Sequence, residues 1–274
     1  MRAPRVDLES SSSSSEAESW AFVPVRRGNI IRRNHENAKD TEEASDNIDI
    51  DELREAVTKT LQTLTPLLER EGFFDRYDSY WEGATVVAAY GVGSISNSSL
   101  ARFQLALMLA IVQRSKISQC FFFDPVLSKT EIRLLESLHV KSALRDLELT
   151  PFCDNGKTLF FMPHCDRELY EWVLMHKLSP NSDAVFVSNC FSNYALKSPT
   201  WELIVPFFDE ELLLLYSSDY QKYLLRKNRF AARAAEKSGQ VPFGAFNDLG
   251  FIRVHRGRQD FITQALVRME QNCS

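Results

Sequence analysis

The sequence predicts an α/β fold with three layers, in which helices cover both faces of a doubly wound, mostly parallel sheet. Over residues 84–191, short apolar segments of strand length alternate with longer segments whose apolar residues recur at helical spacing. Several short segments, such as ATVVAAY at 84–90, are apolar on both faces, which is typical of central strands in a parallel sheet. Connections of a dozen residues or more permit the crossovers that parallel pairing requires.

We expect three parts along the 274 residues. Residues 1–46 combine a serine tract with acidic and basic runs, bury too little apolar surface to offset chain ordering, and are predicted to be a disordered tail. Residues 47–82 are a helical lead-in, in which Pro66 is expected to bend or restart the helix and a turn-rich stretch follows it. The α/β domain spans 83–274.

The elements of the domain follow in order. The first strand, 84–90, runs into a glycine pair and a helix that begins near Asn97 or Ser98. The second, 119–125, precedes a helix that opens with Ser128 and Glu131 in a capping-box arrangement. Three further strands are predicted over 140–146, 157–165 and 183–191, then a mostly helical segment over 209–237 and a last edge strand over 246–256. This order is typical of a Rossmann-like domain.

Composition narrows the classes of partner. A formal net charge of −5 gives the core domain no general attraction to a phosphate backbone, so we expect no direct nucleic-acid binding by the core. The five cysteines lack CxxC spacing, which argues against a disulfide framework and a metal site. The longest apolar run, 105–112, is too short for a membrane span. We therefore expect a soluble protein of the cytoplasm, and the arginines between 26 and 33 also permit import into the nucleus.

Polar residues follow four of the predicted strands, at the end where parallel sheets bind ligands. Gly93 and its neighbours form either a cradle for a ligand or only a tight turn, because glycine suits both. Asp124 is either a ribose partner or an acid that satisfies loop amides, and His164 either contacts a ligand or satisfies its own loop. The sequence thus predicts a crevice for a small nucleotide-like ligand of unknown identity, with no catalytic or metal-binding residue. Its members are Gly91, Gly93, Ser94, Ser96, Asp124, His164, Asn189 and Tyr194.

Five segments taken together resemble the sensitivity-to-red-light-reduced (SRR-like) family. They are YGVGSISNSSLARFQLAL, FFDPVLSKTEIRLLESL, TLFFMPHCDRELYEWVL, SNCFSNY and AFNDL, which begin at Tyr90, Phe122, Thr158, Ser188 and Ala245. The resemblance implies a regulatory protein of circadian-clock input, clock gene expression and haem biosynthesis. It also implies action through a bound ligand or protein partners, and it carries over no catalytic residue.

The alternative is an enzyme, a methyltransferase that uses S-adenosylmethionine on an unidentified substrate. The convergence of polar strand ends favours it, with Gly91 and Gly93 facing the methionine part of the cofactor and Asp124 on the ribose. Against it, Tyr90 stands where such enzymes usually carry an acid ahead of the glycines.

Overall fold

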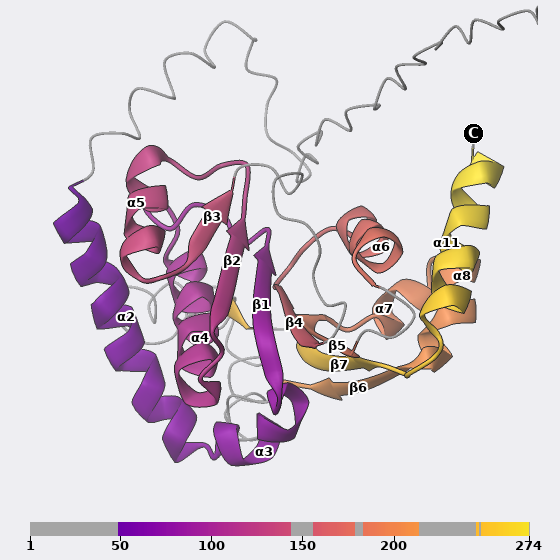
Figure 1. The fold of residues 1–274 in the computed structure, drawn as a ribbon, viewed down its shortest axis with the longest axis horizontal. Coiled ribbons are helices and arrows are strands. Elements are labelled where there is room, and N and C mark those ends of the chain that lie inside the picture. The colour runs from indigo at the N-terminus through magenta and orange to yellow at the C-terminus, as the bar shows by residue number, and fades with distance from the viewer. Residues whose placement is uncertain (1–48, 144–155, 179–182, 214–244, 247, 274) are drawn as a thin grey trace, which may run out of the picture. The chain divides into compact units, whose positions relative to one another are not determined.

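The computed structural model describes residues 49–143, 156–178, 183–213, 245–246 and 248–273. Within them a seven-stranded sheet has the order β3-β2-β1-β4-β5-β7-β6 (Figure 1). The strands are β1 (Ala84–Tyr90), β2 (Gln119–Phe123), β3 (Lys141–Ala143), β4 (Lys157–Met162), β5 (Asp183–Asn189), β6 (Phe208–Leu212) and β7 (Leu249–Val254). The first five pair in parallel, and β7 runs antiparallel to both of its neighbours, β5 and β6. The mostly parallel, doubly wound α/β fold is confirmed.

Helices cover both faces of the sheet, as Figure 1 shows. One face carries α2 (Ile50–Arg70), α3 (Phe73–Trp81), α4 (Ser99–Ser115) and α5 (Lys129–Ser137). The other carries α6 (Arg167–His176), α7 (Ser192–Ala195), α8 (Pro199–Ile204), the 3-10 turn η3 (Val205–Phe207) and α11 (Gln259–Cys273). The three layers are therefore held by two hydrophobic cores, one on each side of the sheet.

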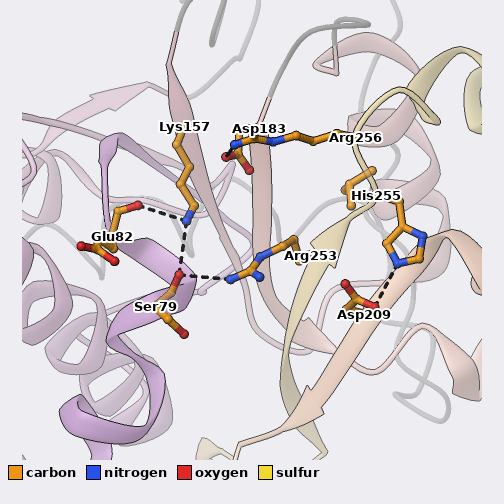
Figure 2. A pocket seen from close by; sticks show the side chains of 9 residues that line it. Ser79, Glu82, Lys157, Asp183, Asp209, Arg253, His255 and Arg256 are labelled. Carbon is orange, nitrogen blue, oxygen red and sulfur yellow. Dashed lines mark hydrogen bonds and ion pairs between the residues drawn. The ribbon is translucent and has the colours of Figure 1, made fainter.

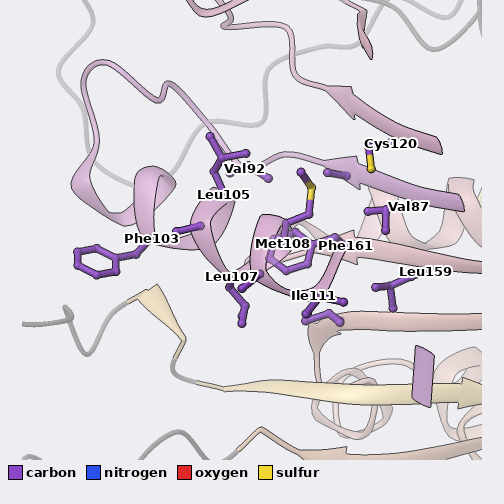
Figure 3. Close-up of a cluster of buried hydrophobic side chains, with 14 of the residues drawn as sticks. Val87, Val92, Phe103, Leu105, Leu107, Met108, Ile111, Cys120, Leu159 and Phe161 are labelled. Carbon is purple, nitrogen blue, oxygen red and sulfur yellow. The ribbon is translucent and has the colours of Figure 1, made fainter. Parts of the chain in front are cut away.

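Alternation along the central strands explains the two cores. In β4, Leu159 and Phe161 face the first core, while Phe160 and Met162 face the second. Figure 3 shows Leu159 and Phe161 packed towards the apolar face of α4, where Met108 lies. Because successive side chains of a strand point to opposite faces, a strand buried on both sides must be apolar throughout.

The structure corrects two details of the lead-in segment. Of the two effects expected of Pro66, a restart of the helix does not occur, since α2 continues through Pro66 to Arg70. Leu64 and Leu68 flank Pro66 and are fully buried, and burying two leucines offsets the roughly 3 kcal/mol that an internal proline costs. The supposedly turn-rich stretch contains α3, whose Phe73, Tyr77 and Trp81 recur at helical spacing and are all buried.

Three differences concern the C-terminal part. Residues 209–212 were expected to be helical but lie in β6, which pairs with β7 at the edge of the sheet. The predicted last edge strand is β7, which lies inside the sheet between β5 and β6. The sequence reading did not anticipate α11. The N-terminal tail, the end of the third predicted strand and the rest of the predicted helical segment, 213–237, fall outside the described residues except for Leu213.

Among the described residues, no helix combines the length and apolar content needed to cross a membrane. Cys120 and Cys165 are buried and Cys190 is half-buried, and among the described residues none of the three takes part in a disulfide.

Candidate functional site

The strand order reverses between β1 and β4, because the chain runs outward from β1 to β2 and β3 before it returns to β4 on the other side. In open α/β sheets, ligands bind outside the carboxyl ends of the strands at such a switch point. We call this end of the sheet, where the parallel strands finish, the carboxyl edge. It holds all eight predicted site residues, which follow or end β1, β2, β4 and β5: Gly91, Gly93, Ser94, Ser96, Asp124, His164, Asn189 and Tyr194.

Asp124 binds the glycine turn directly. Its Oδ2 accepts the N–H of Gly93 at 2.7 Å, and its Oδ1 accepts the N–H of Val126 at 3.0 Å. The side chain is only 4% exposed, and burial raises the pKa of its carboxyl although the two N–H donors oppose the rise. Of the two roles left open, satisfying loop amides is the one that this geometry displays, and both carboxylate oxygens already have partners.

Glu131 holds the serines that follow the glycines. Its Oε1 accepts the N–H of Ser96 and the hydroxyls of Ser94 and Ser96 at 2.8–2.9 Å, while Oε2 accepts the N–H of Ser128 at 2.6 Å. Glu131 is fully buried, which alone would raise its pKa, but the four donors together lower the pKa below the ordinary value. The serine hydroxyls are therefore turned to α5.

A second network joins the ends of β4 and β5. The N–H of His164 donates to Oδ1 of Asn189 at 3.1 Å, and Nδ2 of Asn189 lies 3.5 Å from the hydroxyl of Tyr194. That hydroxyl lies 3.5 Å from the carbonyl oxygen of Cys165. Burial is the main cause that raises the pKa of Tyr194. His164 adopts φ 54°, a left-handed turn that the Asn189 side chain stabilises from outside.

Gly91 and Cys165 bring the two networks into contact. Sγ of Cys165 donates to the carbonyl oxygen of Tyr90 at 3.2 Å, directly before the first glycine. A Cβ on Gly91 would lie 2.8 Å from that Sγ, and the φ of Gly91 is +63°. A side chain there would therefore both crowd the sulfur and strain the backbone. Gly93 differs, because a Cβ there would meet no atom within 4 Å. Open space therefore begins at Gly93.

The sequence reading missed two residues of this edge, Glu131 and Cys165, as parts of the site. Glu131 had a signal, because it precedes the buried Leu134 and Leu135 by three and four residues and so shares their inward face. Cys165 follows His164 at the end of the predicted strand 157–165, so its place at this edge could be predicted, but only the tertiary contact with Gly91 shows that it belongs to the site. Among the described residues, no three histidine, cysteine, aspartate or glutamate side chains are grouped so as to hold a metal ion.

The SRR1 domain family matches residues 57–253. The SRR1-like protein of Mus musculus is 29% identical over 156 residues, which are 52% of this chain and 63% of that protein. The protein SENSITIVITY TO RED LIGHT REDUCED 1 of Arabidopsis thaliana is 36% identical over 116 residues, 38% of this chain and 39% of that protein. The match therefore spans less than two thirds of either relative.

Two solved structures of methyltransferases are also similar to the chain. The plantazolicin methyltransferase BpumL in complex with SAH has a TM-score of 0.32 at 13% identity over 79% of this chain and 100% of its own. The 23S rRNA methyltransferase ErmE has a TM-score of 0.33 at 12% identity over 72% of this chain and 98% of its own.

Proposed function

Because the chain belongs to the SRR1 domain family, we propose that it is a regulatory protein that acts in clock input and clock gene expression and in the regulation of haem biosynthesis. The name of the Arabidopsis thaliana relative, which refers to sensitivity to red light, supports a role in the response to light. The haem connection rests on the resemblance alone. We place this activity in the cytoplasm and nucleus, together with one or more protein partners.

The carboxyl edge is the part of the molecule through which we propose that it acts, by binding a ligand or a partner segment. The observation that carries this is the place of Gly93 at the switch point, where a turn tied to Asp124 leaves space beside the backbone. A rigid rim around an open position costs little ordering entropy when a ligand binds.

The chemistry of this rim limits the ligand. Helix N-termini and glycine turns usually bind phosphate through backbone N–H groups. Here the N–H groups of Gly93 and Ser96 already donate to the buried carboxylates of Asp124 and Glu131. A phosphate would have to displace one acid and lie close to the other. We therefore expect a ligand that places a neutral or cationic group at the turn.

This limit bears on the second candidate, a methyltransferase that uses S-adenosylmethionine. That cofactor carries a sulfonium cation and no phosphate, so the buried acids favour it over NAD or ATP at the same turn. The ribose role expected for Asp124 requires its carboxylate to give up Gly93 or Val126, or to accept an additional donor. We keep this candidate second for that reason.

A complementation experiment tests the regulatory role. Cells that lack the protein receive wild type, Gly93→Ala or Gly83→Ala, and rhythmic reporter expression and haem content are measured. The two glycines are matched, because both have positive φ and neither has an atom within 4 Å of an added Cβ, but Gly83 precedes β1 at the other end of the sheet. We expect Gly83→Ala to restore both readouts and Gly93→Ala to fail at equal protein abundance. Full rescue by Gly93→Ala contradicts the role of the carboxyl edge.

A further inference from the structure

A pocket of about 570 Å³ (Figure 2) lies at the end of the sheet where the parallel strands begin, opposite the end that holds the candidate site. Its walls are the end of α3, the first residues of β4, β5 and β6, the end of β7 and the turn after it. We call this side the amino edge, since the parallel strands begin there. The volume falls within the roughly 300–1,000 Å³ of small-molecule sites.

Lys157 is the first residue of β4 and is half-buried in this pocket. Its Nζ donates to the backbone carbonyl oxygens of Glu82 at 3.1 Å and Ser79 at 3.5 Å, at the end of α3. Burial is the main cause that lowers the pKa of its ammonium; the charge of Asp183 opposes this, and the smaller effect of the Arg253 charge adds to it. Within the described residues Lys157 forms no ion pair with a carboxylate.

Arg253 lies beside Lys157 with the same charge. Its Nη2 donates at 3.1 Å to the carbonyl oxygen of Ser79, the oxygen that Lys157 also reaches. Its guanidinium stacks on the ring of Tyr80, with Cζ 4.9 Å from the centroid. The stack and the hydrogen bond hold the guanidinium in place, and a guanidinium carries five N–H donors in all. In the part of the chain that the structure describes, Arg253 too lacks an ion-pair partner.

The acids of the pocket are engaged elsewhere. Asp183 pairs with Arg256 at 2.8 Å, and Asp209 with His255 at 2.9 Å, both at the rim. Glu82 is exposed and meets Lys157 through its backbone oxygen. Taken together, these three acids balance Lys157, Arg253 and Arg256, so the pocket as a whole has no excess charge. Lys157 and Arg253 share one neutral carbonyl oxygen and form no ion pair with these acids among the described residues, although the charge of Asp183 still favours the ammonium of Lys157.

We propose that this pocket binds an oxyanion, the phosphate or carboxylate group of a small ligand, between Lys157 and Arg253. An anion there relieves the repulsion between the two cations and replaces the hydration that Lys157 has lost. Arginine presents paired N–H donors to an oxyanion, and lysine adds a point charge. The site is independent of the proposed function, because it lies at the other edge of the sheet.

Titration calorimetry on the full chain tests the proposal, with sodium phosphate and sodium citrate as separate probes at constant ionic strength. We expect at least one probe to bind saturably, and Arg253→Gln and Lys157→Gln each to weaken binding by about tenfold or more, the loss of one charge-assisted hydrogen bond. The matched control is Arg70→Gln, which removes an exposed arginine on α2 and should leave binding unchanged.

Three results overturn the proposal. They are saturable binding of neither probe, binding by Arg253→Gln equal to wild type, and loss of binding in Arg70→Gln as well. If a pocket variant does not fold, amide chemical shifts of the wild type replace it. Phosphate or citrate should then move the signals of Lys157 and Arg253, and movement confined to Gly93 and its neighbours contradicts the placement. Which probe binds tells a phosphate ligand from a carboxylate ligand.

Discussion

Replacing Glu131 by alanine should destabilise the protein by about 3–5 kcal/mol, because the change strips the acceptor from four donors at once. A hydrogen bond to a charged group contributes about 1.5–3 kcal/mol. The two backbone donors, on Ser96 and Ser128, dominate the sum, since the half-buried hydroxyls of Ser94 and Ser96 can turn to water. For a domain of this size the melting temperature should fall by roughly 6–20 °C.

Urea unfolding followed by circular dichroism measures this change, with Glu136→Ala as the control on the same helix. Glu136 is exposed, so its removal should stay within about 0.5 kcal/mol of wild type. The effect should also depend on pH. The folded pKa of Glu131 lies below its unfolded value of about 4.3, so the stabilisation is present at neutral pH and is lost as pH falls through the folded pKa. A cost below about 1 kcal/mol for Glu131→Ala, or an equal cost for the control, refutes the reasoning.

Three further predictions concern neighbouring groups. Burial holds the folded pKa of Asp124 above its unfolded value, so the wild type loses stability as pH rises through the folded pKa. Asp124→Asn lacks this titration and should therefore gain stability relative to wild type as pH rises above about 4. Urea unfolding across pH measures the difference in unfolding free energy between the two proteins, and a difference that stays constant with pH speaks against the prediction. Gly91→Ala should cost about 1–3 kcal/mol, and less in a Cys165→Ala background; equal costs would show that the Sγ contact is unimportant. Iodoacetamide at pH 8 should modify Cys120 and Cys190 slowly in the folded protein, because burial raises both pKa values to about 11. Site-resolved mass spectrometry measures the modification rate of each cysteine, and rates in the folded protein equal to those in urea would contradict this.

The fold was predictable where tertiary context adds little to the local pattern. Segments such as 84–90 and 183–189 are apolar on both faces, and such segments with long connections between them favour a parallel sheet. The prediction failed where tertiary contacts decide. Residues 208–212, FDEEL, carry the charges of an exposed edge strand, and only pairing with β7 makes them a strand.

The candidate site was predictable in its location and not in its internal contacts. Strand ends can be located from the sequence, so Gly93, Asp124, His164 and Asn189 were placed at one edge before their contacts were known. Which donor meets which acceptor depends on distances between loops. The bond from Gly93 to Asp124 joins residues 31 positions apart, and no local spacing encodes it.

Amide chemical-shift mapping tests most directly whether the carboxyl edge is a ligand site. The labelled full chain is titrated in turn with S-adenosylmethionine, haem, NAD and ATP. We expect one of the first two to shift the amide signals of Gly91, Gly93, His164 and Asn189 saturably, and the two phosphate-bearing compounds to leave them in place. If no compound moves these signals, the carboxyl edge is not a site for such ligands, and movement by NAD or ATP alone contradicts the role given to the buried acids.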